Sequence, residues 1–121
     1  MLSEGLSDNM YNLKIEKINF DKAERLKVEE FLSAFNLLLD KDVEYTIVAK
    51  NKDKILGTCS CAGKVLKCFA VNENHQGEGI ASKLITHMTN YLFDKGIFET
   101  FVFTKLNNTC VFEGLGYREV Y

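Results

Sequence analysis

The stretch from Val71 to Ala81, Val-Asn-Glu-Asn-His-Gln-Gly-Glu-Gly-Ile-Ala, combines two glycines with the change from a strand to a helix. Gly77 and Gly79 allow the backbone to approach a ligand closely, and the small Ala81 allows the helix to lie near the strand. A helix that begins here directs unpaired N–H groups and the positive end of its dipole at one point. We therefore expect the loop to bind an anion, with a phosphate or pyrophosphate as the natural ligand.

Two common nucleotide-binding motifs do not fit this loop. Gly77-Glu78-Gly79 lacks the third glycine of the dinucleotide fingerprint, and the chain has no Gly-Lys-Ser/Thr sequence for a P-loop. A glycine-rich turn without any ligand stays open as the alternative, because short Gly-x-Gly matches are frequent by chance.

Three side chains are candidates for proton transfer or nucleophilic chemistry. Glu73 and His75 are candidate general bases, although solvated loop residues are the ordinary alternative. Cys110 is a candidate nucleophilic thiol if its pKa is lowered, and otherwise packs within a helix. The spacing of the four cysteines and two histidines fits no zinc site, so we expect no metal.

The elements that must position these residues alternate between strands and helices. Apolar residues four apart predict a long helix after the loop, ended by Lys95-Gly96, and Asp21 is placed to cap an earlier helix. The strand-like runs are 11–18, 44–50, 54–61, 64–71, 97–104 and 117–121, and a short helix is expected over 108–115. The order β-α-β-β-β-α-β-α-β predicts an α/β (α+β) fold with a mixed sheet, in which residues 64–104 cross over between parallel neighbours.

Composition and charge describe an ordinary globular domain. The chain has 121 residues, 46% of them hydrophobic and 26% charged. Its 15 basic and 17 acidic residues give a net charge of −2, so nucleic acid and acidic membranes are not expected partners. We find no apolar run of membrane-spanning length and no secretory signal pattern, and we expect a cytoplasmic protein with reduced cysteines.

Two segments resemble the GNAT superfamily of acetyl-CoA-dependent acyltransferases. Gln76-Gly77-Glu78-Gly79-Ile80-Ala81 is similar to its Gln/Arg-x-x-Gly-x-Gly/Ala signature, and the segment 108–117 is similar to its Asn…Tyr/Phe-x-x-Leu-Gly-Phe/Tyr element. The likeness runs from about Glu44 onward. It implies a GNAT-like fold with a central crossover helix, and acetyl-CoA or a CoA-like pantetheine arm as the ligand.

A narrower resemblance is to the N-terminal domain of the citrate lyase ligases. It rests on the segments 40–46, 63–68, 76–79, 103–105 and 112–117. Ligases of this family use ATP and acetate to acetylate the thiol on the acyl-carrier subunit of citrate lyase, and their ATP-using domain follows the GNAT-like one. No trace of that domain occurs in this sequence, so we expect residues 1–121 to form one domain, shortened at its C-terminus, of a larger protein.

The resemblance implies roles for particular residues. The strand before the loop would separate from its neighbour and pair, through the backbone of Phe69 and Val71, with the thioester and pantetheine. The N–H groups of the loop and first helical turn would hold the pyrophosphate, and Asn108 and Phe112 would line the thiol end. The loop residues are Gln76, Gly77, Glu78, Gly79, Ile80 and Ala81. The side chains of Phe69, Val71 and Ile80 are expected in the core in either case.

The chain departs from the family pattern at three places. Phe112 stands where many members carry a tyrosine that protonates the leaving thiolate, the helix 108–116 is short, and Glu73 replaces a frequent proline. These departures weaken the case for a freestanding N-acetyltransferase of a small amine or protein N-terminus. Phe112 and the lack of a clear general base favour either a ligase domain or a non-catalytic module that binds CoA or the acyl-carrier arm.

The charge of the loop bears on which ligand it takes. His75 and Lys83 are its only cations, and Glu73 and Glu78 oppose them. Coenzyme A carries a 3′-phosphate that is usually met by lysine or arginine. We therefore hypothesise a ligand without this phosphate, such as the dephospho-CoA-derived arm of citrate lyase.

Overall fold

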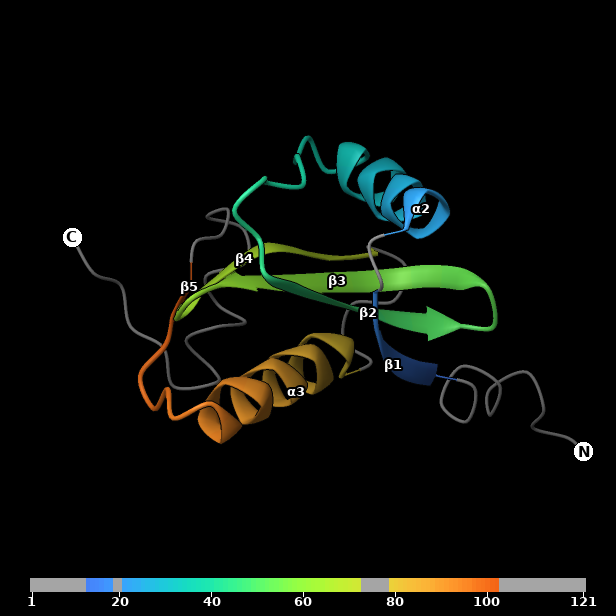
Figure 1. Ribbon diagram of the computed structural model, residues 1–121. Coiled ribbons are helices and arrows are strands. Elements are labelled where there is room, and N and C mark those ends of the chain that lie inside the picture. Colours follow the sequence, from blue (N-terminus) through green and yellow to red (C-terminus); the bar gives the residue numbers. More distant parts are fainter. Residues whose placement is uncertain (1–12, 19–20, 73–78, 103–121) are drawn as a thin grey trace, which may run out of the picture.

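The computed structural model describes residues 13–18, 21–72 and 79–102. One mixed sheet in the order β1-β2-β3-β4-β5 forms the centre of the molecule (Figure 1). Neighbours from β1 to β4 are antiparallel, and β4 pairs with β5 in parallel. The elements are β1 (Leu13–Lys17), α2 (Lys22–Ser33), β2 (Tyr45–Asn51), β3 (Lys54–Ala62), β4 (Val65–Val71), α3 (Ile80–Asp94) and β5 (Phe101–Val102).

This arrangement confirms the predicted mixed α/β fold and the α3 connection between parallel neighbours. The helix and strand expected over 108–115 and 117–121 lie outside the described residues. The strand expected over 97–104 begins only at Phe101, and Ile97 still belongs to the end of α3. There Gly96, with φ 86°, donates its N–H to the Phe93 carbonyl, and Ile97 donates to the Leu92 carbonyl.

Helix α2 begins and ends at residues that suit those positions. The carboxylate of Asp21 accepts a hydrogen bond from the Glu24 N–H at 2.9 Å, as the capping pattern predicts. Asn36 adopts φ 59°, and Leu37 donates to the Leu32 carbonyl, which ends the helix. Leu39 lies beyond this end, in the following loop, and is also buried.

The two helices cover opposite faces of the sheet (Figure 1). On the α2 side, Val28 and Leu32 pack with strand residues such as Val48 and Cys68. On the α3 side the core is larger and takes in Ile47, Ala49, Leu56, Cys59, Cys61, Leu66, Phe69, Val71, Ile80, Leu84, Ile85, Met88 and Leu92. Neither described helix is long and apolar enough to cross a membrane.

Two tyrosines connect the C-terminal end of α3 with the sheet. The rings of Tyr45 on β2 and Tyr91 on α3 are stacked, with centroids 3.6 Å apart and planes 3° from parallel. The ammonium of Lys17 lies 5.5 Å from the Tyr45 ring centroid, and that of Lys95 lies 4.9 Å from the Tyr91 ring centroid. Burial and the neighbouring Tyr91 and Cys61 raise the pKa of Tyr45.

Candidate functional site

The strand before the glycine loop and the helix after it lie where the sequence places them. Strand β4 ends at Val71, and the Asn72 N–H still donates to the Leu56 carbonyl of β3 at 2.7 Å. Gly79 then precedes α3 with φ 81°, a left-handed conformation that favours glycine, and its carbonyl accepts from the Lys83 N–H. A Cβ added to Gly79 would meet no atom within 4 Å, so the backbone angle is what requires glycine here.

The described residues of the first turn of α3 carry no negative charge. Within the described part of the chain, no side chain caps this end, and its first turn contains no acidic residue. The N–H groups of a first helical turn have no partners inside the helix, and the helix dipole places partial positive charge there. This end of α3 is therefore suited to an anion.

Gly57 on β3 brings α3 close to the sheet. A Cβ added to Gly57 would lie 3.0 Å from Leu84 Cδ1, 3.1 Å from Ile80 Cγ2 and 3.3 Å from the Ala70 carbonyl. Gly57 is also the register partner of Val71. The end of β4 and the beginning of α3 therefore meet beside Gly57. The sequence analysis did not identify Gly57 as part of the site. The only sequence signal for it is a single glycine inside a predicted strand.

Strand β4 contains a bulge just before the residues expected to bind the ligand. Thr58 pairs with Ala70 and Ser60 pairs with Lys67, so Cys59 faces two residues of β4, Cys68 and Phe69. Cys68 has φ 53°, which is rare for a residue with a side chain. Beyond the bulge, Phe69 and Val71 turn their side chains into the α3-side core, as predicted, and their backbones form the strand.

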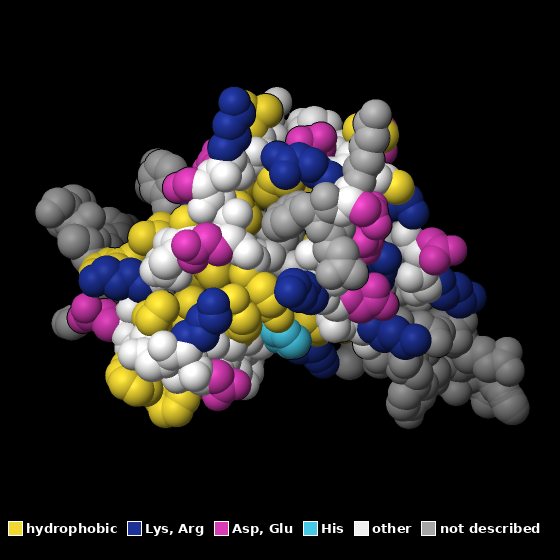
Figure 2. Space-filling model, viewed as in Figure 1, with side chains coloured by type: hydrophobic (Ala, Val, Ile, Leu, Met, Phe, Trp, Pro, Cys, Tyr) yellow, Lys and Arg dark blue, Asp and Glu magenta, His cyan; other side chains and the backbone are white. Residues whose placement is uncertain are grey.

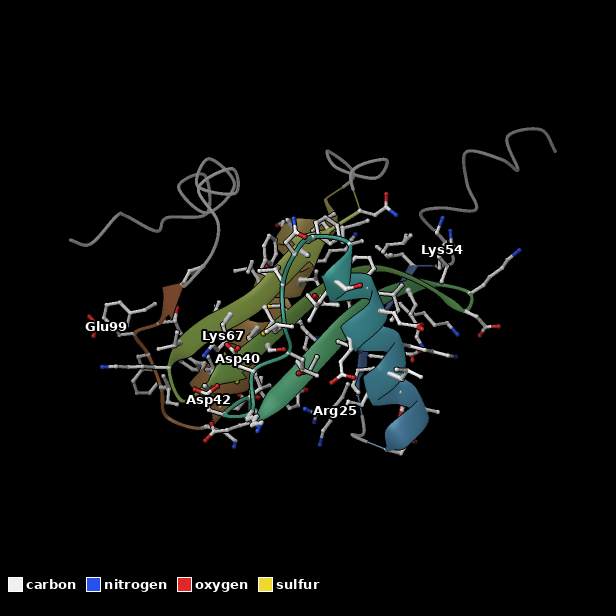
Figure 3. All side chains as sticks on the ribbon, turned by 90° about the horizontal axis from the view of Figure 1, so that it is seen from above. Arg25, Asp40, Asp42, Lys54, Lys67 and Glu99 are labelled. Atoms are coloured by element: carbon white, nitrogen blue, oxygen red, sulfur yellow. The ribbon has the colours of Figure 1, made fainter. Side chains whose placement is uncertain are left out.

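Ion pairs connect β4, next to its bulge, to the loop that follows α2. The Lys67 ammonium lies 2.9 Å from Asp40 Oδ2 and 3.2 Å from Asp42 Oδ1, and the three side chains point toward one another (Figure 3). Hydrogen bonds to Asp40 and Asp42 raise the pKa of Lys67. Two of the segments that carry the narrower resemblance, 40–46 and 63–68, thus meet at this ion cluster, which the sequence alone did not reveal.

The described cysteines are not suited to nucleophilic chemistry. Cys59, Cys61 and Cys68 are buried and form no disulfide. Burial raises the pKa of all three thiols, that of Cys61 to about 11. Each thiol is therefore protonated near neutral pH, and a protonated thiol is a poor nucleophile. No group of three potential metal ligands occurs within residues 13–18, 21–72 and 79–102.

The structure brings together those predicted ligand-binding residues that it describes. Val71 on β4 and Ile80 at the start of α3 both lie beside Gly57. Phe69 is on the same strand as Val71, and Gly79 and Ala81 flank Ile80 in the chain. Strand β5 pairs with β4 at Val65 and Leu66, and the predicted separation of the two strands falls beyond the described part of β5. The other candidates also lie outside the described residues: Glu73, His75, Gln76, Gly77, Glu78, Asn108, Cys110 and Phe112.

Comparisons with known proteins indicate the family to which the chain belongs. A sequence model of the acetyltransferase (GNAT) family matches residues 9–111. A citrate (pro-3S)-lyase ligase of Klebsiella pneumoniae is 36% identical over 87% of the chain, and one of Haemophilus influenzae is 27% identical over 87%. The chain spans about a third of the length of these relatives, 31% and 32% respectively.

Solved structures share the fold at lower sequence identity. An aminoglycoside acetyltransferase from an uncultured soil metagenomic sample superimposes with a TM-score of 0.72 at 18% identity, covering 90% of this chain and 93% of that one. At this identity the likeness concerns the fold alone. The family match over most of the chain, together with the fold and the glycine loop, is decisive: this chain is a member of the acetyltransferase (GNAT) family.

Proposed function

We propose that the chain binds acetyl-CoA, or a CoA-like pantetheine arm, along β4 and at the N-terminal end of α3. The observation that carries this proposal is the contact over Gly57, which holds the end of the bulged strand β4 beside the start of α3, whose first turn has no acidic residue. The backbone of Phe69 and Val71 would pair with the pantetheine. The pyrophosphate would lie on the N–H groups of residues 76–81, and the thiol end would lie against Asn108 and Phe112.

This arrangement suits acyl transfer. A backbone N–H of β4 that donates to the thioester carbonyl would stabilise the negative charge that develops on its oxygen during attack. The start of α3 would neutralise part of the pyrophosphate charge. Glu73, His75 and Cys110 remain the candidates for the groups that move the proton or accept the acyl group.

We further propose that the chain is the N-terminal domain of a citrate lyase ligase, because its curated relatives at 27–36% identity carry that name. The acyl acceptor would then be the thiol of the acyl-carrier subunit of citrate lyase, and ATP would act through a domain outside this sequence. Three described cysteines without disulfides suit the cytoplasm as its location. A freestanding N-acetyltransferase and a non-catalytic binding module are the alternatives, and Phe112, which cannot donate a proton, argues against the first.

Calorimetric titration with acetyl-CoA, CoA and dephospho-CoA tests the binding proposal. We expect Gly79→Ala to weaken binding about tenfold, because a strained helix start misplaces the N–H groups on the pyrophosphate. Gly63→Ala is the matched control, since Gly63 is also exposed, has φ 58° and has no neighbour within 4 Å of an added Cβ. Absence of binding or of a thermal shift with all three ligands would refute the proposal.

The same titration tests the nature of the ligand. We expect dephospho-CoA to bind at least as tightly as CoA, and clearly tighter binding of CoA would contradict a ligand without the 3′-phosphate. A thiol-release assay with acetyl-CoA and a panel of amines addresses the reaction. Rapid turnover of an amine would favour the freestanding N-acetyltransferase over the ligase domain.

A further inference from the structure

The bulge in β4 places two consecutive side chains on the same face of the sheet. In a regular strand, consecutive side chains point to opposite faces. Leu66 packs in the α3-side core, so regular alternation would direct Cys68 to that side as well. Cys68 belongs instead to the α2-side core, and Lys67 contacts the loop that follows α2. Both side chains therefore meet the same loop.

The loop segment Leu38–Asp42, which we call the strap, is held to β4 by ion pairs. The Lys67 ammonium lies 2.9 Å from Asp40 Oδ2 and 3.2 Å from Asp42 Oδ1 (Figure 3). Only 15% of the Lys67 side chain is exposed, against 44% and 64% for the two carboxylates. The cation is thus enclosed by the strap, whereas its partners face the solvent.

The backbone of the strap is otherwise weakly attached. Among the hydrogen bonds of the described residues, no N–H of the strap donates to a backbone carbonyl. The Cys68 thiol donates to the Leu38 carbonyl at 3.5 Å, and Leu39 is buried in the α2-side core. A segment with few backbone hydrogen bonds and few buried contacts opens at a lower free energy than the whole fold.

We propose that the strap opens and closes on the α2 side of β4 and that the ion pairs of Lys67 hold it closed. In the closed form Cys68 is only 7% exposed. Opening breaks these ion pairs, the thiol hydrogen bond and the contacts of Leu39, while α2 and the sheet stay folded. Salt screens ion pairs between partly exposed groups, so ionic strength favours the open form. The strap thereby controls access to the bulge of β4 from the side opposite α3.

Labelling of the wild type with N-ethylmaleimide, read out by peptide mass spectrometry, tests whether the strap opens by itself. Cys59 on β3 is completely buried in the α3-side core, so its labelling reports global unfolding. We expect Cys68 to be labelled about tenfold faster than Cys59 or more, because local opening costs less than unfolding. Raising the salt concentration from about 0.05 M to about 1 M should accelerate the labelling of Cys68 alone.

Lys67→Met tests the ion pairs, and Lys50→Met is its matched control. Lys50 has a similarly covered side chain, 19% exposed, and pairs with Glu16 at 3.5 Å on the far side of the sheet order from β4. We expect Lys67→Met to label Cys68 about fivefold faster, the upper range for a partly exposed ion pair, and to abolish the salt effect. Lys67→Arg should restore slow labelling, and Lys50→Met should leave it unchanged.

A double variant removes the ion pairs from the side of the strap. A cation beside a thiol also favours the reactive thiolate, and Lys67→Met removes this effect together with the ion pairs. Asp40→Asn combined with Asp42→Asn keeps Lys67 in place. It should therefore accelerate the labelling of Cys68 at least as much as Lys67→Met does. This variant also replaces Lys67→Met should the latter not fold.

Equal labelling rates of Cys68 and Cys59 in the wild type would overturn the inference, since Cys68 would then be exposed only by global unfolding. An equal effect of Lys67→Met and Lys50→Met, or no effect of the double variant, would also overturn it. The assay contains no CoA ligand, so its outcome is independent of the proposed function.

Discussion

Cys68 occupies a backbone conformation that makes glycine the favoured replacement. In an ordinary strand, glycine is less stable than alanine by about 0.5–1 kcal/mol. At φ 53° the order reverses, because a Cβ costs about 1–2 kcal/mol in the left-handed region. We expect Cys68→Gly to be more stable than Cys68→Ala by about 1 kcal/mol in urea unfolding. If alanine proved the more stable replacement, Cys68 would not be strained.

The buried thiols make the stability of the fold sensitive to alkaline pH. Burial, followed by the neighbouring Glu44, raises the pKa of Cys61 from 9.0 to about 11. A thiol that holds its proton more tightly in the folded state stabilises it fully below pH 9, and this contribution is lost as pH rises through 11. The loss for Cys61 is about 2–3 kcal/mol.

Urea unfolding between pH 7 and pH 11 measures this effect in the wild type and in Cys61→Ala. The variant should start less stable at pH 7 and lose less stability on the way to pH 11. Equal losses for both proteins would mean that the Cys61 thiol titrates normally. The difference in thiolate absorbance between the wild type and Cys61→Ala gives the pKa of Cys61 as an independent check.

At the scale of elements, the close packing of α3 against β3 requires a residue without a side chain at Gly57. Gly57→Ala would place a methyl group 3.0–3.3 Å from Leu84, Ile80 and the Ala70 carbonyl. We expect a loss of about 1–3 kcal/mol in the free energy of unfolding, typical of overpacking, and a weaker interaction with acetyl-CoA because the start of α3 is displaced. Unfolding curves and calorimetric titration measure the two effects.

Gly63→Ala serves as the control for this prediction. It strains the turn between β3 and β4 through its backbone angle, and no atom lies within 4 Å of an added Cβ. It should therefore lower stability without altering ligand binding. Unchanged binding by Gly57→Ala would show that the position of α3 does not determine affinity.

The elements also show which features could be predicted from the sequence. The periodicity of Ile80, Leu84, Met88 and Leu92 predicts α3, and Gly96 predicts its end, because both signals are local. The bulge at Cys68 depends on the pairing register of β3 and β4, which these local signals do not determine. The extent of β5 could not be predicted either, since it depends on pairing with β4, a strand distant in sequence. The same holds for the ion cluster of Lys67, whose partners lie more than twenty residues away.

For the molecule as a whole, one sheet supplies both hydrophobic cores. Consecutive β4 residues alternate between them, with Ala70 in the α2-side core and Phe69 and Val71 in the α3-side core. Loss of one core should therefore unfold the other. We expect Leu32→Ala and Leu84→Ala, one in each core, to cost about 2–5 kcal/mol each while unfolding stays a single transition in far-ultraviolet circular dichroism. Two separate transitions would contradict this coupling.

Charges of both signs are interspersed over the side of the molecule shown in Figure 2, on which both α2 and α3 are visible. This distribution agrees with the net charge of −2 and leaves no broad field of one sign on that face. Long-range electrostatic attraction would thus contribute little to capturing an anionic ligand there. Its affinity would depend on short-range contacts with the backbone N–H groups of the proposed site.

The stacked pair of Tyr45 and Tyr91 gives the protein a built-in optical probe. The chain has five tyrosines and no tryptophan, so its near-ultraviolet circular dichroism comes largely from tyrosine. Two rings fixed at 3.6 Å form a rigid asymmetric chromophore, and such signals vanish when tertiary packing is lost. Because one ring belongs to β2 and the other to α3, this band would report when the C-terminal end of α3 leaves the sheet, without any attached label.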